Sequence, residues 1–412
     1  MSLNKVVITG VGVVSPFGIG KAPLDEALLA GRSAVVSRRD LWEEKLSDLT
    51  CWLGAPLGEP LDVKSIPRKL RRSMGRVAML AYLATTEALE QAQVGDKELS
   101  SDRIGISFGS TIGSVASIEE FFSACLEHRA IGGLPANIFF QFMNHTCAAN
   151  LAHAFGVSNR VLSPSAACAS SLQAIGCGIE TIEQGRQDIM ICGGADELHM
   201  MVSACFDLVH AASHGFNDRP TCTPRPFDHN RDGIVCGEGA GAIILESEKS
   251  AEARGAEALA QIEGCATTCE GKHMAQPHRE SIVRCLKEAL DDSGLAPGDI
   301  EYVSAHATGT VEGDREEARA LQEVFGARNV PVSSLKGHLG HTLGASGAVE
   351  LAACLSMQKG GYLVPTRNLQ EPGEGCEGLD HVTGLRRVGF GRFMKSSFAF
   401  GGVNSVLIVK GL

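Results

Sequence analysis

Three residues that lie far apart in the sequence have the types and local settings needed for acyl transfer. Cys168 stands in a run of small residues, Ala166–Ser171, between an apolar strand pattern and a helical one. The free N–H groups and the dipole at a helix N-terminus favour the thiolate, which is the nucleophilic form of cysteine. His306 and His341 lie near strand ends or glycine-rich turns, and two imidazole N–H groups can stabilise a developing oxyanion. The three together predict one nucleophile served by two hydrogen-bond donors.

Each of these residues alone has a more ordinary interpretation. The chain has 14 cysteines, several of them inside apolar runs, so a buried structural thiol competes with a nucleophile at any single position. Cys265 and Cys269 are spaced like metal ligands, but the two histidines that follow are too close for a zinc finger, and we expect no metal ion.

The elements that must position these residues alternate between short apolar strands and longer helices, which is typical of an α/β fold with strands buried on both faces. The predicted strands are Lys5–Gly10, Arg103–Phe108, Val161–Ser165, Asp188–Cys192, Gly241–Leu245, Ala258–Gly264, Tyr302–His306, Pro331–Ser334, Phe393–Phe400 and Ser405–Lys410. The predicted helices are Val77–Ala92, Cys168–Gln184, Ser281–Ser293, Asp314–Phe325 and Ser346–Met357.

The order of these elements looks similar in the two halves of the chain. In each half a strand, Val161–Ser165 or Pro331–Ser334, leads through a turn of small residues into a helix. This predicts an internal duplication. The first half, 1–250, carries the cysteine, and the second, 251–412, carries the two histidines and a lysine, Lys336. Two unrelated α/β halves are the alternative, and the chemistry is the same in both cases.

Composition and charge exclude several classes of protein. A hydrophobic fraction of 44% with 48 glycines describes a compact globular chain. The net charge of −11 argues against nucleic-acid binding, which needs clustered basic residues. No apolar run reaches eighteen residues, and glycines interrupt the stretch Val6–Val14, so we expect a buried first strand, no membrane insertion and a cytoplasmic location.

Ordered motifs along the chain match one enzyme family. They are Ile8–Gly12, Ala166–Ser171, Arg225–Asp228 with Arg231–Gly233, Gly237–Gly241, His306–Thr310 with Gly313-Asp314 and Glu317, Lys336 ahead of Gly340-His341, and Phe398–Asn404. From about residue 4 to residue 410 the sequence resembles the elongating 3-oxoacyl-acyl carrier protein synthases, in particular the type II enzymes, of the thiolase-like superfamily.

The resemblance implies a thiolase-like α/β fold in which two duplicated βαβαβαββ halves form five alternating layers, αβαβα. It implies that Cys168 is acylated, that His306 and His341 bind and decarboxylate a malonyl unit, and that Lys336 orders the site and pairs with Glu317. Because the family's motif follows His341, the resemblance also implies that His338 is structural or supports the catalytic residues from behind. The remaining implied site residues are Phe400 and Gly401 as a gate, the N–H groups of Phe400 and Cys168 as an oxyanion hole, and Thr308, Thr310, Phe398, Ile112, Ile118 and Phe140 as substrate or pocket contacts.

The reaction implied is the decarboxylative Claisen condensation of malonyl-acyl carrier protein with the acyl group on Cys168. It gives a 3-oxoacyl-carrier protein, CO₂ and free carrier protein in fatty-acid elongation, and no cofactor is expected. A ketosynthase of a specialised type II polyketide or aryl-polyene pathway is the alternative, because it would use the same residues. Some relatives bind a monovalent cation at positions matching Ser304, Ser396, Ser397 and Glu350, but the serines are weaker ligands, so such a cation is not expected here.

A basic segment is the exception in this acidic protein. Arg68–Arg76 carries five positive charges in nine residues. A solvated helix start is the ordinary interpretation, but the resemblance implies an acidic acyl carrier protein as partner, its thioester held on phosphopantetheine, docking at Lys69 and Arg72. The resemblance also implies a homodimer.

Three other enzyme or protein types fit the sequence less well. A thiolase would have a second cysteine near the C-terminus, where Phe398–Asn404 has none. An initiating synthase usually has asparagine in place of the second histidine, which is His341 here. A non-catalytic partner subunit normally lacks the nucleophile, and Cys168 is present.

Overall fold

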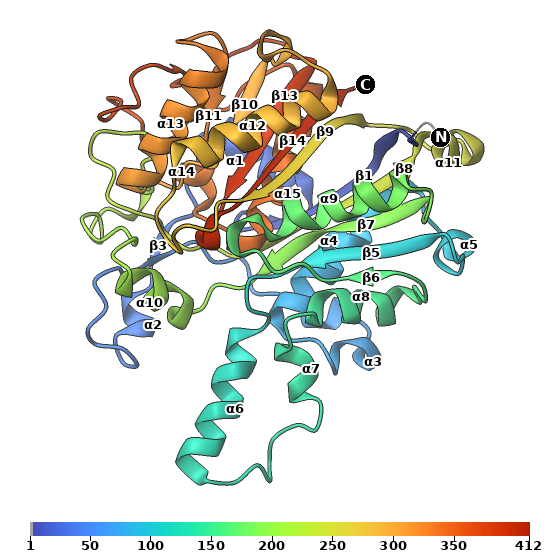
Figure 1. The fold of residues 1–412 in the computed structure, drawn as a ribbon. Coiled ribbons are helices and arrows are strands. Elements are labelled where there is room, and N and C mark those ends of the chain that lie inside the picture. Colours follow the sequence, from blue (N-terminus) through green and yellow to red (C-terminus); the bar gives the residue numbers. More distant parts are fainter. Residues whose placement is uncertain (1–2) are drawn as a thin grey trace.

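A 12-stranded mixed β-sheet runs through the computed structural model, which describes residues 3–412 (Figure 1). Its order is β12-β11-β10-β13-β14-β9-β1-β8-β7-β5-β6, with β2 added beside β1. The strands of the first half are β1 (Val6–Ser15), β2 (Gly18–Ile19), β5 (Ile104–Gly109), β6 (Val161–Leu162), β7 (Ile189–Asp196) and β8 (Gly239–Ser247). Those of the second half are β9 (Ala260–Cys269), β10 (Tyr302–Ser304), β11 (Pro331–Ser333), β12 (Asp380–His381), β13 (Arg392–Phe398) and β14 (Val403–Gly411).

The two sets of strands repeat one topology. In the first half β5 is parallel to β6 and β7, and β7–β8 and β8–β1 are antiparallel. In the second half β10 is parallel to β11 and β13, and β13–β14 and β14–β9 are antiparallel. The duplicated α/β architecture expected from the sequence is confirmed.

Helices separate the two parts of the sheet. The parts are joined by only two residue pairs between β1 and β9. Helix α9 (Ser170–Glu183) contacts β5, β7 and β8 of one part and β9 and β14 of the other, and α15 (Ser346–Gly360) likewise contacts both parts. Residues on all sides of α15 are buried, as a helix in a middle layer requires. Gly241 allows close packing there, because a Cβ at this position would lie 2.6 Å from that of Ala348.

Further helices cover the outer faces. Helix α4 (Arg76–Ala92) packs on β1, β7 and β8, and α8 (Thr146–Phe155) packs on β5. On the other side α12 (Arg279–Ser293) packs on β9 and β14, with α13 (Val311–Phe325) against it. The order is therefore helix, sheet, helix, sheet, helix, which is the five-layer thiolase-like arrangement.

Several elements were not predicted from the sequence. Helices α6 (Val115–His128) and α7 (Ile138–Phe142) form an arm, residues 115–142, that projects from the body (Figure 1). The other short elements are α1 (Lys21–Leu29), β3 (Val36–Ser37), α2 (Arg39–Trp42), β4 (Leu53–Gly54), α3 (Arg68–Arg71), α5 (Asp96–Leu99), α10 (Met200–Leu208), α11 (Glu248–Arg254) and α14 (Lys336–Leu339).

Two predicted boundaries were wrong near Cys168. The strand predicted over Val161–Ser165 ends at Leu162, because the chain leaves the sheet edge to enter a turn. The helix predicted to begin at Cys168 begins at Ser170, after a single 3₁₀ turn over Ala167–Ala169. None of the helices in the described residues is long and apolar enough to cross a membrane.

Candidate active site

A tight turn presents Cys168 at the junction of the two halves. Ala167 has a φ of 46°, in the left-handed region that costs an alanine about 1–2 kcal/mol. The Ser170 hydroxyl holds the turn by accepting from the Ala166 N–H at 2.9 Å and donating to the Ala167 carbonyl at 2.7 Å. The second half repeats this turn over Leu343–Ala345 before α15, with a φ of 53° at Leu343. The two turns contact each other, so the repeated junctions meet at one point.

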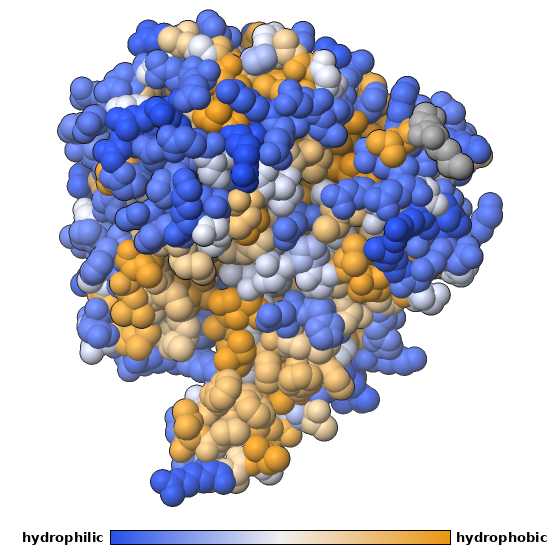
Figure 2. All heavy atoms as spheres, in the orientation of Figure 1, coloured by the Kyte–Doolittle hydropathy of each residue, from blue (hydrophilic) through white to orange (hydrophobic). Residues whose placement is uncertain are grey.

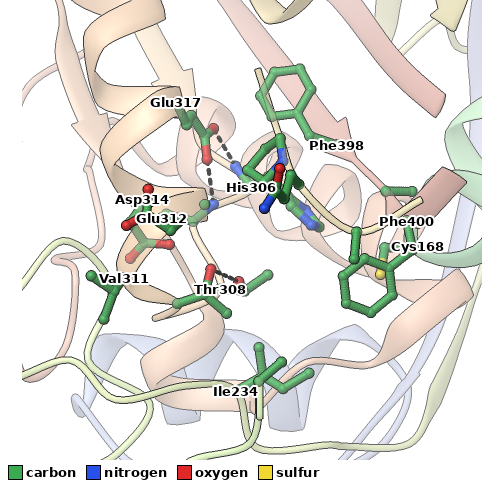
Figure 3. Close-up of a pocket in the computed structure, with 18 of the residues that line it drawn as sticks. Cys168, Ile234, His306, Thr308, Val311, Glu312, Asp314, Glu317, Phe398 and Phe400 are labelled. Carbon is green, nitrogen blue, oxygen red and sulfur yellow. Dashed lines mark hydrogen bonds between the residues drawn. The ribbon is translucent and has the colours of Figure 1, made fainter. Parts of the chain in front are cut away.

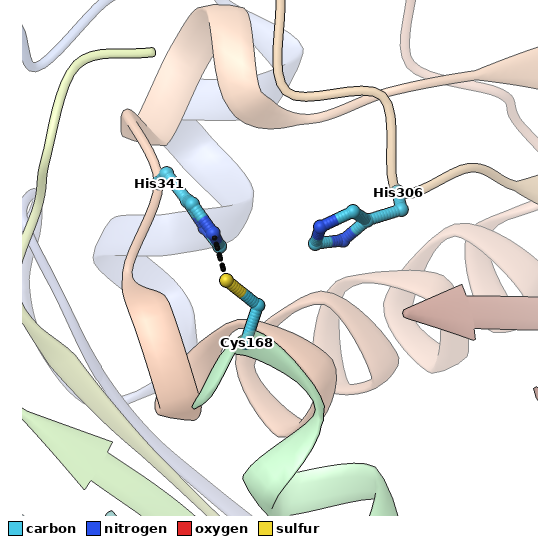
Figure 4. A group of neighbouring side chains, drawn as sticks. All are labelled: Cys168, His306 and His341. Carbon is cyan, nitrogen blue, oxygen red and sulfur yellow. Dashed lines mark hydrogen bonds between the residues drawn. The ribbon is translucent and has the colours of Figure 1, made fainter. Parts of the chain in front are cut away.

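Cys168, His306 and His341 lie together in this buried site (Figure 4). The Cys168 Sγ is 2.9 Å from His341 Nε2. The ring of His306 stands edge-on to that of His341, with centroids 5.4 Å apart and an interplanar angle of 81°. The sulfur and one nitrogen of each ring all lie within 4.8 Å of one another. The structure thus brings together the three residues that the sequence singled out.

The site holds neutral imidazoles and a protonated thiol. Burial, followed by the positive charge of Lys336, holds the pKa of both His306 and His341 well below its ordinary value. Burial raises the pKa of the Cys168 thiol to about 12, and the nearby Lys336 ammonium offsets this only in part. Burial thus acts against the thiolate that the helix end was predicted to favour, and a protonated thiol is the expected resting form. His341 Nε2 is the adjacent group able to accept the thiol proton.

This pKa predicts how Cys168 reacts with an alkylating reagent. Below its pKa a thiol gains thiolate about tenfold per pH unit, so labelling by iodoacetamide should still be rising steeply at about pH 10. Lys336→Met should slow labelling at any one pH, because the Lys336 ammonium lowers the thiol pKa and its removal would raise that pKa. Peptide mapping by mass spectrometry separates Cys168 from the other cysteines. A labelling rate that levels off near neutral pH would contradict the conclusion that the Cys168 thiol is protonated at that pH.

The ion pair of Lys336 differs from the expected one. Lys336, on α14, bonds to Glu350 of α15, and both side chains are buried. Glu317, on α13, instead accepts from the backbone N–H groups of His306 at 2.7 Å and Ala307 at 2.6 Å. The predicted Lys336–Glu317 pair was wrong, because the Glu317 carboxylate is engaged by the loop that carries His306.

Sequence reasoning missed a second buried lysine in this cluster. Lys395, on β13, is fully buried, and its Nζ lies 2.8 Å from Glu350 Oε2. It also donates to the Ser396 carbonyl at 2.6 Å and lies 3.5 Å from that of Ser304. The ammonium therefore lies among the residues at which some relatives bind a monovalent cation. A lysine inside the apolar strand Arg392–Phe398 was the signal available in the sequence.

A cavity of about 300 Å³ leads away from Cys168 and the histidines (Figure 3). Of the residues predicted to bind substrate or to gate the site, Thr308, Thr310, Phe398 and Phe400 line it, and so does Glu317, which was predicted to pair with Lys336. Its rim is apolar and exposed at Val209, Met274, Val311 and Phe400.

The segment predicted to be the gate is held by α10 and by the loop that follows β9. Phe400 stacks on Phe206 with ring centroids 5.7 Å apart. Gly401 has a φ of 84° and donates its N–H to the Met274 carbonyl at 2.7 Å. A Cβ at Gly401 would meet nothing within 4 Å, so only backbone conformation requires glycine there.

Other predicted residues lie away from this cavity. Ile112 packs against a small apolar cluster that includes Val115 and Leu343, and Ile118 lies on α6. Lys69 and Arg72 are exposed on and just after α3, which packs on α8, and neither lines the cavity. His338 is structural as predicted: its two ring nitrogens bond to the carbonyls of Arg32 at 2.8 Å and Pro365 at 3.0 Å.

Comparison with known proteins places the chain among homologous enzymes. The family model "Beta-ketoacyl synthase, N-terminal domain" matches residues 3–251, and "Beta-ketoacyl synthase, C-terminal domain" matches residues 259–370. The chain is 34% identical to the tetracenomycin polyketide synthase ketoacyl synthase alpha subunit of Streptomyces glaucescens, over 93% of this chain and 91% of that protein. It is 33% identical to 3-oxoacyl-[acyl-carrier-protein] synthase 1 of Haemophilus influenzae, over 99% of both.

Solved structures agree with this relationship. A beta-ketoacyl synthase from Burkholderia phymatum superposes with a TM-score of 0.95 at 41% identity, covering 99% of this chain and 100% of that one. A type II polyketide ketosynthase, solved in complex with its acyl-carrier protein, superposes with a TM-score of 0.90 at 27% identity and covers 100% of both chains. The chain belongs to the beta-ketoacyl synthase family and is a ketosynthase of the thiolase-like fold.

Proposed function

We propose that this ketosynthase condenses the malonyl unit of malonyl-acyl carrier protein with an acyl group held on Cys168, in fatty-acid elongation. The products are 3-oxoacyl-carrier protein, CO₂ and free carrier protein. The observation that carries the proposal is a thiol and two neutral imidazoles within 4.8 Å of one another at the inner end of a cavity.

Acylation comes first. The Cys168 sulfur attacks the thioester carbonyl of the acyl-carrier protein, and the thiol proton passes by way of His341 Nε2 to the departing carrier thiol. The backbone N–H groups of Cys168 and Phe400 would hold the tetrahedral oxyanion, since the turns that carry them contact each other. A proton acceptor 2.9 Å from the sulfur supports this role for His341, because burial keeps the free thiol protonated.

Decarboxylation and condensation follow. As the bond to CO₂ breaks, its electron pair forms an enolate whose oxygen accepts N–H bonds from His306 and from His341, which is then in its Nε2–H tautomer. The enolate carbon attacks the acyl carbonyl on Cys168, the C–S bond breaks, and the departing sulfur takes up one proton that enters from solvent. Neutral rings suit this step, because each offers an N–H without burying a net charge. Lys336 orders the site through Glu350.

The cavity residues would handle the substrate arm. We assign Thr308 and Thr310 to binding the phosphopantetheine of the carrier, with Phe398 beside the reacting atoms, because all three line the cavity. Phe400 and Gly401 would act as the gate to the acyl pocket. Movement of the gate requires Phe400 to leave its stack on Phe206.

A specialised polyketide or aryl-polyene pathway is the second candidate for this enzyme. The Streptomyces polyketide relative and the Haemophilus 3-oxoacyl synthase are nearly equal in identity to this chain. A competition among carrier-bound acyl chains of different length and unsaturation, read as the mass of the adduct on Cys168, tests the choice. Preference for saturated chains supports fatty-acid elongation, and preference for polyunsaturated or polyketide chains supports the alternative.

The acyl carrier protein is proposed to dock on α3. Reversing two charges with Lys69→Glu/Arg72→Glu should raise the KM for carrier-bound substrate by about tenfold with little change in kcat, since docking contacts act mainly on encounter. Lys97→Glu/Lys249→Glu makes the same charge change on α5 and α11 and should leave KM unaltered. Steady-state kinetics at two salt concentrations measure the effect, and an unchanged KM in the first variant would refute docking at α3.

A homodimer is proposed to form on the arm. Five of its large apolar side chains are exposed in the single chain: Phe122 at 52%, Leu126 at 76%, Ile131 at 69%, Phe139 at 58% and Phe140 at 48%. Figure 2 shows hydrophobic residues over most of the side of the arm that faces the viewer. Exposed apolar patches of this kind mark interaction sites. A second copy of the chain is the occupant that the family resemblance implies.

Charged residues in the arm should break the dimer. Leu126→Asp/Phe139→Asp is expected to shift sedimentation velocity from a dimer to a monomer, because each carboxylate would be buried without a partner. Leu41→Asp/Val388→Asp, at exposed apolar positions outside the arm, should remain dimeric. A dimer that survives the arm variant would place the interface elsewhere.

The cysteines fit a cytoplasmic location, which we also propose. All 14 are free thiols in the structure. Reduced thiols in such number suit a reducing compartment.

A further inference from the structure

Lys395 is a buried charge that the condensation steps above do not use. Its side chain is 0% exposed, on a strand whose neighbours Phe393 and Met394 are also fully buried. Taking an ammonium group out of water costs several kcal/mol unless it is paired and hydrogen-bonded. Here the pairing is specific: the ammonium meets one carboxylate oxygen of Glu350 at 2.8 Å and the Ser396 carbonyl at 2.6 Å, with the Ser304 carbonyl at 3.5 Å.

One carboxylate is thereby shared between two lysines. Glu350 Oε1 bonds to Lys336 and Glu350 Oε2 faces Lys395, so the carboxylate is fixed at both ends. With Glu317 nearby, the buried cluster holds two ammonium groups and two carboxylates. Burial raises the pKa of Glu350, but the charges of Lys336 and Lys395 outweigh it and the pKa lies below its ordinary value. Without Lys395 the cluster would hold one excess negative charge.

The contacts of Lys395 connect three segments, α15, β10 and β13, that hold the reacting groups in place. Glu350 holds Lys336, whose charge acts on Cys168 and on both imidazoles. Ser304 ends β10, two residues before His306. Ser396 donates to Glu317 Oε1 at 3.3 Å, and Glu317 holds the backbone of His306. A displacement of the Lys395 ammonium would therefore move both Lys336 and the His306 loop.

We propose that Lys395 is a positioning residue for the decarboxylation step, and that its ammonium is a built-in monovalent cation that joins α15, β10 and β13. This proposal rests on the malonyl decarboxylation proposed above. Lys395 acts through Glu350 and Ser304 and does not touch substrate. The enzyme consequently needs no added monovalent cation to hold these segments in register.

The test separates positioning from simple stability. Lys395→Met keeps the length of the side chain and removes its charge. We expect decarboxylation of malonyl-carrier protein and condensation to fall by about 100-fold, the scale of a displacement of about 1 Å at a reacting group. Acylation of Cys168, read as adduct mass, should fall by only about threefold, because it feels the shift of Lys336 but does not use the His306 donor. Lys410→Met, on the adjacent strand β14, is the matched control and should behave as wild type.

Chemical rescue provides the second measurement. Lys395→Ala leaves a space bordered by Glu350 Oε2 and two carbonyl oxygens, which ammonium can occupy. Ammonium chloride should restore decarboxylation by about tenfold relative to tetramethylammonium chloride at the same ionic strength, because the larger ion does not fit. The wild-type rate should be the same in both salts.

The outcomes are distinct. Lys395→Met within about threefold of wild type in decarboxylation, or a Lys395→Ala loss that ammonium does not reverse in a folded protein, would overturn the proposal. A wild-type enzyme that does not decarboxylate malonyl-carrier protein would instead remove the proposed function. If Lys395→Met fails to fold, the salt comparison on Lys395→Ala decides the question, and a wild-type rate that depends on the cation would count against a built-in charge.

Discussion

Replacement of Cys168 by alanine is expected to abolish condensation while the enzyme still releases CO₂ from malonyl-carrier protein. Without the sulfur no acyl group can be held, and loss of a covalent nucleophile removes at least about 10⁴-fold of the rate. The two imidazoles remain in place, because neither segment is held by the thiol alone: Glu317 fixes the backbone of His306, and the backbone N–H of His341 donates to the Val235 carbonyl at 2.7 Å. Decarboxylation thus becomes uncoupled from bond formation.

Two measurements check this result. Mass spectrometry after exposure to acyl-carrier protein should find no adduct on the variant, and release of labelled CO₂ should persist. Cys236→Ala is the matched control: it removes another buried thiol, on the segment paired with His341. This variant should still form the acyl adduct on Cys168. An adduct on a different cysteine of the Cys168→Ala variant would mean that the nucleophile lies elsewhere.

Replacement of His306 by alanine is expected to separate the two half-reactions. Decarboxylation should fall by about 100- to 1000-fold, the usual effect of losing one oxyanion donor. Acylation of Cys168 should be nearly unchanged, because His341 and not His306 contacts the sulfur. His341→Ala, in contrast, should slow both steps, since it removes the proton acceptor and a donor together.

Rapid-quench measurement of the Cys168 adduct, alongside CO₂ release, distinguishes these variants. His306→Asn serves as the matched control, because an amide N–H placed near the lost imidazole should recover part of the decarboxylation rate. Equal losses in acylation and decarboxylation for His306→Ala would show that the histidine supports the whole site and not one step.

The sequence predicted the parts of the site that reside in local patterns. Cys168, His306 and His341 each stand at a strand end or turn among small residues, and that setting leaves a side chain free to enter a pocket. The duplication was visible for the same reason, since the strand-to-helix junctions repeat. Buried strands such as β7 and β8 were recognisable from their continuous apolar runs.

The features that could not be predicted depend on contacts between residues that are far apart in the sequence. Spacing alone gave no way to choose between Glu317 and Glu350 as the partner of Lys336, because the choice depends on which carboxylate the His306 loop already engages. Lys395 had no visible partner until α15 was placed against β13. The pKa of Cys168 depends on complete burial, which a helix-start motif does not report. Most of the large apolar side chains of the arm are exposed, so no pattern of core packing identified it.

The two left-handed turns, at Ala167 and at Leu343, have a consequence for the history of this chain. They are copies of one feature, and they touch where the halves meet, so a dimer of single halves would have brought two identical junctions face to face. After duplication only one copy had to retain the thiol, and the other was free to supply imidazole. Neither half now holds a complete site, and selection therefore acts on the two as one inseparable unit.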